Sequence, residues 1–209
     1  MKALIATLAA IFASTFLAAP TMGAGWFWDT GNALGFVAFG GLLYLTITSN
    51  RRLDVRAHQV LGYGVLFVAI AHAFWFLLGD AAVAEFLKPG APDYMWLGAA
   101  SLLSLGVLMT VALVPDRMRV HKTYPTFKYW HRVVAVATVA SATYHIVVSE
   151  FYLRTWYQVV LFVLLAIVAT SGRAYWIKLG QMPIATNLAY VIVGSVFAVL
   201  FVAVRNLPL

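Results

Sequence analysis

The sequence predicts an all-α integral membrane protein, a bundle of six or seven transmembrane helices. Three observations predict this fold class. Of the 209 residues, 63% are hydrophobic and 10% charged, whereas a typical soluble domain has roughly 25% charged residues. The apolar residues gather in long stretches close to the length that a membrane-spanning helix needs, about 20 residues. The basic residues alternate between the two sides of these stretches, as topology signals do.

Seven apolar stretches account for most of the chain. They cover residues 3–19, 31–48, 57–79, 94–114, 130–150, 155–172 and 186–205. Five prolines fall in the connections between them, where helix-breaking residues are expected: Pro89, Pro92, Pro115, Pro125 and Pro183. A separate soluble domain of normal size, roughly 100 residues or more, does not fit beside these stretches. Residues 25–209 are therefore predicted to form a single transmembrane domain.

The first stretch has two interpretations. Lys2, a short apolar core and the small residues Gly23 and Ala24 are typical of a cleaved signal peptide over residues 1–24. The same residues are also compatible with a short first transmembrane helix. Both alternatives place residues 24–30 on the same side of the membrane, so the topology of the rest is unaffected.

The basic residues predict the orientation. Lys88, Arg154 and Arg205 lie on one side, together with Asp29, Asp80, Glu85, Asp93 and Glu150. The opposite side holds Lys2, Arg51, Arg52, Arg56, Arg117, Arg119, Lys122, Lys128, Arg173 and Lys178. By the positive-inside rule the second side is cytoplasmic, which predicts a multi-pass protein of the plasma (inner) membrane in contact with lipid. This placement explains the net charge of +7 without nucleic-acid binding.

The chain has no cysteine. Disulfides, thiolate metal sites, iron–sulfur clusters and covalently attached c-type haem are therefore excluded.

The histidines follow one spacing rule. His58 and His72 are 14 residues apart in the third stretch, and His131 and His145 are 14 apart in the fifth. Fourteen residues make nearly four helical turns, so each pair lies on one helix face, with its members about 21 Å apart along the axis. One histidine of each pair is thus expected near each membrane surface.

The two stretches are separated by a single crossing, so they run in the same direction. His58 then shares the cytoplasmic level with His131, and His72 shares the outer level with His145. Two facing imidazole pairs, one above the other, are what two bis-histidine b haems require. Small residues one turn from the ligands would leave space for the macrocycles: Gly62, Ala69, Ala135 and Ala142. A zinc ion is disfavoured, because histidines about 21 Å apart on one helix cannot share it.

Other charged side chains have candidate roles at the two levels. Anionic haem propionates could pair with Arg56 and Arg132 at the inner level and with Arg154 at the outer level. For each arginine, topology or lipid headgroups are an equally good explanation. The fifth histidine, His121, lies in the loop Asp116–Lys128 and is predicted to be solvated.

With these histidines the chain resembles the ferric-reductase-like transmembrane domain. This superfamily includes NADPH oxidases, ferric reductases and the haem subunit of a methionine-sulfoxide reductase. The resemblance rests on Arg56-Ala57-His58 with His72, and on Trp130-His131-Arg132 with His145. It covers roughly residues 31–172. It implies that His58 and His131 hold an inner haem, that His72 and His145 hold an outer haem, and that electrons cross the membrane between them.

The chain departs from the oxidases in one respect. No glycine-rich nucleotide loop occurs, so no flavin or nicotinamide site is expected in this chain. The sequence therefore predicts an electron-transfer subunit supplied by a separate flavin reductase or by quinol, with an acceptor on the outer side. Two alternatives stay open: a quinol-oxidising b cytochrome of the bc type, and a haem-free transporter or structural subunit that uses the histidines as a proton relay.

Overall fold

The computed structural model describes residues 1–18, 24–47, 54–113, 123–172, 175–176 and 184–207. All regular structure in these ranges is helical, and they contain no strand. The α-helices are α1 (Lys2–Thr15), α2 (Trp26–Thr46), α3 (Asp54–Gly79), α4 (Asp93–Leu113), α6 (Tyr124–Val148), α7 (Trp156–Ser171) and α9 (Asn187–Asn206). A short 3-10 helix, η1 (Ala81–Leu87), follows α3. The predicted all-helical fold is therefore confirmed.

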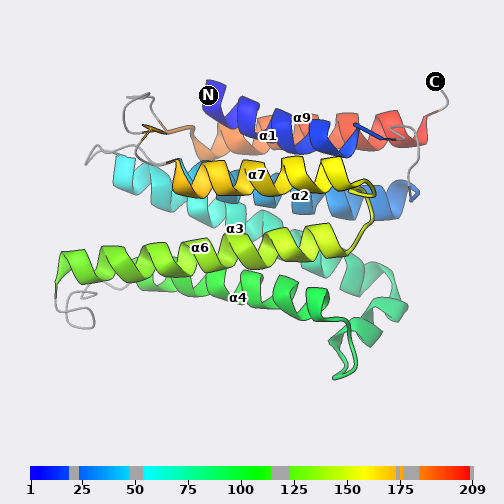
Figure 1. Cartoon of the computed structure of the whole chain (residues 1–209), viewed down its shortest axis with the longest axis horizontal. Helices are drawn as coiled ribbons and strands as arrows, with labels where there is room; N and C mark the ends of the chain where they lie inside the picture. The colour runs from blue at the N-terminus through cyan, green and yellow to red at the C-terminus, as the bar shows by residue number, and fades with distance from the viewer. Residues whose placement is uncertain (19–23, 48–53, 114–122, 173–174, 177–183, 208–209) are drawn as a thin grey trace.

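Within the described residues, four helices are long and apolar enough to cross a membrane. They are α3 (over Val55–Gly79), α4, α6 and α9. α1 and α7 are apolar but shorter, at 14 and 16 residues. α2 has 21 residues, yet it carries the polar residues Asp29 and Asn32 and is surrounded by other helices. The long axes run side by side, as Figure 1 shows, so the molecule is a membrane-protein bundle.

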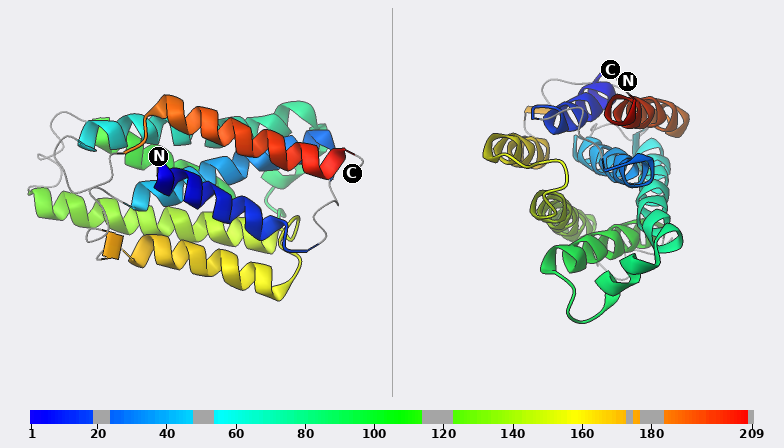
Figure 2. Two further views of the ribbon diagram at one scale, coloured as in Figure 1. Left: turned by 90° about the horizontal axis from the view of Figure 1, so that it is seen from above. Right: turned by 90° about the vertical axis from the view of Figure 1, so that its right-hand side faces the viewer.

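α2 is the central helix of the bundle. It packs along α3 and also against α1, α9 and α7, and the end-on view in Figure 2 shows it between the α1 and α9 pair and the remaining helices. α4 packs along α6. By contrast, α3 and α6 make few backbone contacts with each other. The two helices that carry the histidine pairs therefore meet through side chains.

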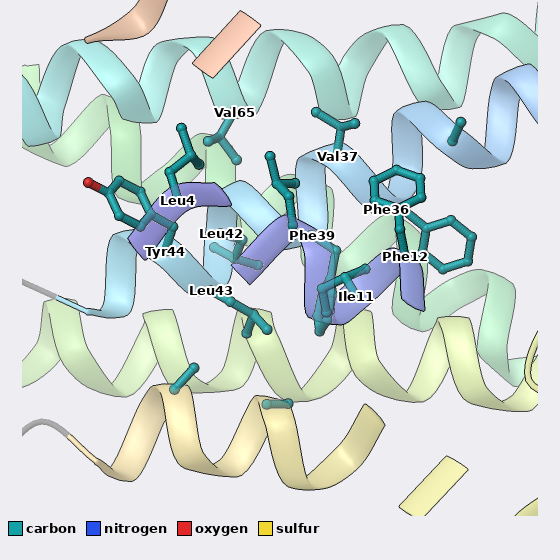
Figure 3. Close-up of a cluster of buried hydrophobic side chains, with 14 of the residues drawn as sticks. Leu4, Ile11, Phe12, Phe36, Val37, Phe39, Leu42, Leu43, Tyr44 and Val65 are labelled. Atoms are coloured by element: carbon teal, nitrogen blue, oxygen red, sulfur yellow. The ribbon is translucent and has the colours of Figure 1, made fainter. Parts of the chain in front are cut away.

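α1 packs one face into the apolar core. Leu4, Leu8 and Ile11 are fully buried, and the core in Figure 3 joins this face to the aromatic and aliphatic side chains of α2. Gly40 of α2 makes the close approach possible, because a Cβ there would stand 2.6 Å from Cδ2 of Leu8. This packing is the arrangement expected if residues 2–15 are the first helix of the bundle.

The helices begin at capping residues, which a hydropathy pattern does not identify. α6 begins six residues before the predicted apolar stretch, with Thr123 as N-cap accepting a hydrogen bond from the Thr126 amide and Pro125 in the first turn. Proline suits the first turn because its missing N–H has no partner there anyway. At α7, Oε1 of Gln158 accepts a hydrogen bond from the backbone N–H of Thr155. The predicted boundaries therefore give the extent of the apolar segment, whereas the capping residues determine where the helix begins.

A buried polar network closes the end of the bundle that holds His72 and His145. The Asp29 carboxylate is fully buried; Oδ1 accepts a hydrogen bond from the Tyr152 hydroxyl at 2.6 Å and Oδ2 accepts one from Asn206 at 2.7 Å. Arg205 lies over the rings of Phe16, Tyr152 and Phe201 and donates to the Thr15 carbonyl at 2.8 Å. Burial and the bond to Asp29 raise the pKa of Tyr152 far above its usual value, so the phenol stays protonated and remains a donor.

Replacing Tyr152 by phenylalanine is expected to destabilise this network. Oδ1 of Asp29 would lose the short bond from Tyr152 and keep only the longer one from the Ala24 amide at 3.2 Å. A hydrogen bond to a charged group contributes about 1.5–3 kcal/mol. Tyr157→Phe is the matched control, because the Tyr157 hydroxyl is exposed and makes only a 3.4 Å contact with the Leu17 carbonyl. Thermal unfolding in detergent should show a lower midpoint for Tyr152→Phe than for Tyr157→Phe. Equal midpoints would show that the bond to Asp29 adds no stability.

Candidate functional site: two facing histidine pairs

The structure brings the four histidines of α3 and α6 together in two pairs. The ring centroids of His58 and His131 are 6.4 Å apart, with an interplanar angle of 57°. Those of His72 and His145 are 6.5 Å apart, with an angle of 75°. The pairing is the one that the 14-residue spacing predicts, and the two separations are almost equal.

These separations suit an iron atom between each pair of rings. A metal–imidazole nitrogen bond is about 2.0–2.1 Å long, and the nitrogen stands about 1.1 Å from its own ring centre. Two imidazoles on opposite sides of one metal ion would therefore have centroids about 6.3 Å apart. Both pairs are within a few tenths of an ångström of that value. By contrast, histidines that only hydrogen-bond to each other would not need the same ring-centroid separation in both pairs.

The second ring nitrogen of each histidine in the His72–His145 pair is anchored to a backbone carbonyl. Nδ1 of His72 donates to the carbonyl oxygen of Gly31 on α2 at 2.7 Å. Nδ1 of His145 donates to the carbonyl oxygen of Tyr94 on α4 at 2.9 Å. Because a carbonyl only accepts, Nδ1 carries the proton in both rings and Nε2 is left with its lone pair. A hydrogen bond of this kind orients a metal-ligating histidine and raises its basicity.

Two glycines give these rings their space. A Cβ at Gly35 would stand 2.8 Å from Cε1 of His72, and a Cβ at Gly98 would stand 2.7 Å from Nδ1 of His145. Both distances are too short for any side chain to fit without moving the ring. In each case the glycine follows the accepting carbonyl by four residues, Gly35 after Gly31 and Gly98 after Tyr94. The same arrangement, an accepting carbonyl followed four residues later by a glycine, thus occurs on α2 and on α4.

Sequence reasoning missed Gly35 and Gly98, along with the two carbonyls. Their partners lie on other helices, so no spacing within one stretch indicates them. The repeated signal, a glycine one helical turn after the accepting residue, becomes recognisable only once the helices are known to be adjacent.

Aromatic rings surround both pairs. Phe127 lies 5.6 Å from His131 between ring centroids, and Phe76 meets His72 edge-on at 5.4 Å. Tyr94 lies 6.0 Å from His145. Apolar rings of this kind exclude water from a metal site and lower its local dielectric.

The remaining predicted residues are placed as follows. Gly62 is buried against α4, where a Cβ would stand 2.7 Å from Sδ of Met109. Arg56, Arg132 and Arg154 are all exposed, and their pairing with propionates stays a prediction. Among the predicted basic and histidine positions, Arg51, Arg52, Arg117, Arg119, Lys122, Arg173, Lys178 and His121 lie outside the described residues.

The described residues contain no group of three or more His, Cys, Asp or Glu side chains that could surround a metal ion. Each pair therefore supplies two imidazoles. A structural zinc ion takes four protein ligands and a catalytic one usually three, so two ligands fit zinc poorly. They do fit an iron whose four equatorial ligands come from a porphyrin.

Residues 52–142 match the family described as the ferric reductase like transmembrane component. The matched segment contains His58, His72 and His131 and ends three residues before His145. No curated protein and no solved structure matches the chain. Over residues 52–142 the chain is therefore similar to the ferric reductase like transmembrane component, which is the resemblance that the sequence predicted.

Proposed function

We propose that this protein is a transmembrane di-haem b-type cytochrome that conducts electrons across the membrane. His58 and His131 hold the inner haem, and His72 and His145 hold the outer haem. The observation that carries the proposal is the common separation of the two ring pairs, 6.4 and 6.5 Å, at which one iron fits between each pair. The match to the ferric-reductase-like component supports a membrane electron-transfer role.

The chain's own residues would hold and tune the cofactors. The bonds from Nδ1 of His72 and His145 to the Gly31 and Tyr94 carbonyls fix the tautomer, so that the lone pair of Nε2 would be available to a haem iron. When bound, haem supplies a one-electron couple whose potential depends on its axial ligands, on burial and on nearby charge. Arg56 and Arg132 at one end and Arg154 at the other are candidate partners for the propionates.

The basic end of the bundle is proposed to be cytoplasmic, in a multi-pass plasma-membrane protein. The alternation of Lys and Arg along the sequence supports this orientation. Electrons would then enter from a separate flavin reductase or from quinol at the His58 end and leave to an acceptor at the His72 end. We also propose α1 as the first helix of the bundle, because its buried face packs into the core.

A reduced-minus-oxidised absorption spectrum of the purified protein, with haem counted against polypeptide, tests the proposal. Two b haems per chain are the expected result. One haem would mean that one pair is misassigned. A colourless protein, after expression with ample haem, would overturn the proposal and return the haem-free alternative.

A further inference from the structure

The helices that carry the two histidine pairs belong to different packing units. α4 packs along α6, and we call these two helices the α4–α6 hairpin. α2 packs along α3, and α1, α7 and α9 pack against α2; we call these five helices the main body. α3 and α6 make few backbone contacts with each other. Each histidine pair therefore has one member on the main body and one on the hairpin.

Each unit orients its own member of the outer pair. His72 bonds through Nδ1 to the Gly31 carbonyl at 2.7 Å, and both residues belong to the main body. His145 bonds through Nδ1 to the Tyr94 carbonyl at 2.9 Å, and both residues belong to the hairpin. The glycine one turn further along each accepting helix packs against the same ring. The two units are thus separately organised halves of one site.

Protein contacts hold the hairpin less firmly than they hold the main body. In α6, three of 25 residues are buried, namely Thr138, Val139 and Thr143, whereas twelve of the 21 residues of α2 are buried. Elements with few buried contacts open at a low cost in free energy. The hairpin is therefore the part of the bundle that can move relative to the rest.

The hairpin is joined to the main body at one end only. α3 leads through η1 to α4, and α6 leads through residues 149–155 to α7, both at the His72–His145 end (Figure 1). At the other end the chain passes from α2 to α3, from α4 to α6 and from α7 to α9. Each of these three connections joins helices of the same unit.

Side chains also fasten the joined end. The Tyr152 hydroxyl, in the connection that follows α6, donates to Asp29 of α2 at 2.6 Å. The neighbouring Phe151 ring stacks on Trp28 of α2, with 5.9 Å between the ring centroids. The His72–His145 end therefore has the properties of a hinge.

We propose that the α4–α6 hairpin swings about this hinge and opens the bundle at the His58–His131 end to admit haem. A swing of about 10° would move the far end of a helix about 30 Å long by roughly 5 Å. Gly62 of α3 lies against Met109 of α4, and this contact would part as well. The inference rests on the proposed function, because an iron shared by His58 and His131 would tie the two units together at the open end.

The test is double electron–electron resonance on the full-length protein in lipid nanodiscs. The chain has no cysteine, so pairs of introduced cysteines carry the only spin labels. Val60→Cys with Val133→Cys reports on the opening end, and Phe74→Cys with Val148→Cys reports on the hinge end. These four side chains are between 39% and 52% exposed. Val60→Cys with Leu188→Cys is the matched control, since both positions belong to the main body.

In protein expressed without haem, the distance between labels at Val60 and Val133 should be broadly distributed and longer by roughly 5 Å. Added haemin should give one short, narrow distribution. The labels at Phe74 and Val148 and those of the control pair should keep their distances throughout, because the hinge and the main body do not open.

Two further variants make the test independent of expression without haem. His131→Ala should lose the inner haem, keep the outer one and show the broad distribution between Val60 and Val133. His145→Ala should lose the outer haem and keep narrow distributions at both ends, because the inner iron ties one end and the hinge ties the other.

Haem content, measured by absorption on the same samples, separates the two levels of the argument. Two haems in the wild type, with a distance between Val60 and Val133 that neither haem-free expression nor His131→Ala changes, would overturn the hinge and leave the proposed function standing. Equal broadening at both ends would also overturn the hinge. A wild-type protein that binds no haem would overturn the proposed function and this inference with it.

Discussion

Replacing His145 by alanine is expected to remove the outer haem and leave the inner one, halving the haem bound per polypeptide. Iron held by two imidazoles loses half of its axial ligands, whereas His58 and His131 lie about 21 Å away along the same helices. His72→Ala should give the same result, because it removes the other ligand of the same iron. Haem per chain and the reduced absorption band measure the effect.

The control for these variants is His121→Ala, the same substitution at the histidine that the sequence places in the basic connection. Both haems should remain in this variant. His58→Ala and His131→Ala should in turn remove only the inner haem. If His72→Ala and His58→Ala removed the same haem, the assignment of two separate levels would be wrong.

The second large effect is expected from a methyl group on the helix opposite a ligand. In Gly98→Ala the new Cβ would stand 2.7 Å from Nδ1 of His145, a distance that forces the ring to move. The ring is held by the Tyr94 carbonyl, so movement also weakens that bond and turns Nε2 away from the iron. We expect Gly98→Ala to lose most of the outer haem while the inner haem and the expression level are kept.

Gly106→Ala is a close control, because Gly106 is on the same helix and a Cβ there would meet nothing within 4 Å. This variant should bind two haems and be slightly more stable, since alanine favours a helix over glycine by about 1 kcal/mol. Gly35→Ala, opposite His72, should behave like Gly98→Ala. An unchanged outer-haem spectrum in Gly98→Ala would show that the ring does not depend on this close approach.

The helices and the histidine pairs could be predicted because both depend on periods within one helix. A run of about 20 apolar residues identifies a span, and a 14-residue spacing places two side chains on one face. The positions of His58, His72, His131 and His145 therefore follow from the sequence once the directions of the helices are known.

The rest depends on contacts between residues far apart in the chain. Gly35 and Gly98 look like ordinary small residues of membrane helices until α2 and α4 are seen beside the imidazoles. The sequence indicates Asp29 only as a charge on the outer side, yet it is fully buried and bonded to Tyr152, 123 residues later. η1 was not predicted either, because a 3-10 segment of 7 residues has no hydropathy signal of its own.

The buried polar network that joins α1 and α2 to α9 has a consequence for biogenesis. Arg205 of α9 donates to the Thr15 carbonyl of α1, and Asn206 donates to Asp29 of α2. α1 and α2 are synthesised before α9, so these buried polar groups of α1 and α2 lack their α9 partners until α9 has been made. Until α9 is inserted, Asp29 has a desolvated carboxylate with fewer donors, a state that costs free energy. Completion of this end of the bundle is therefore coupled to the synthesis of α9.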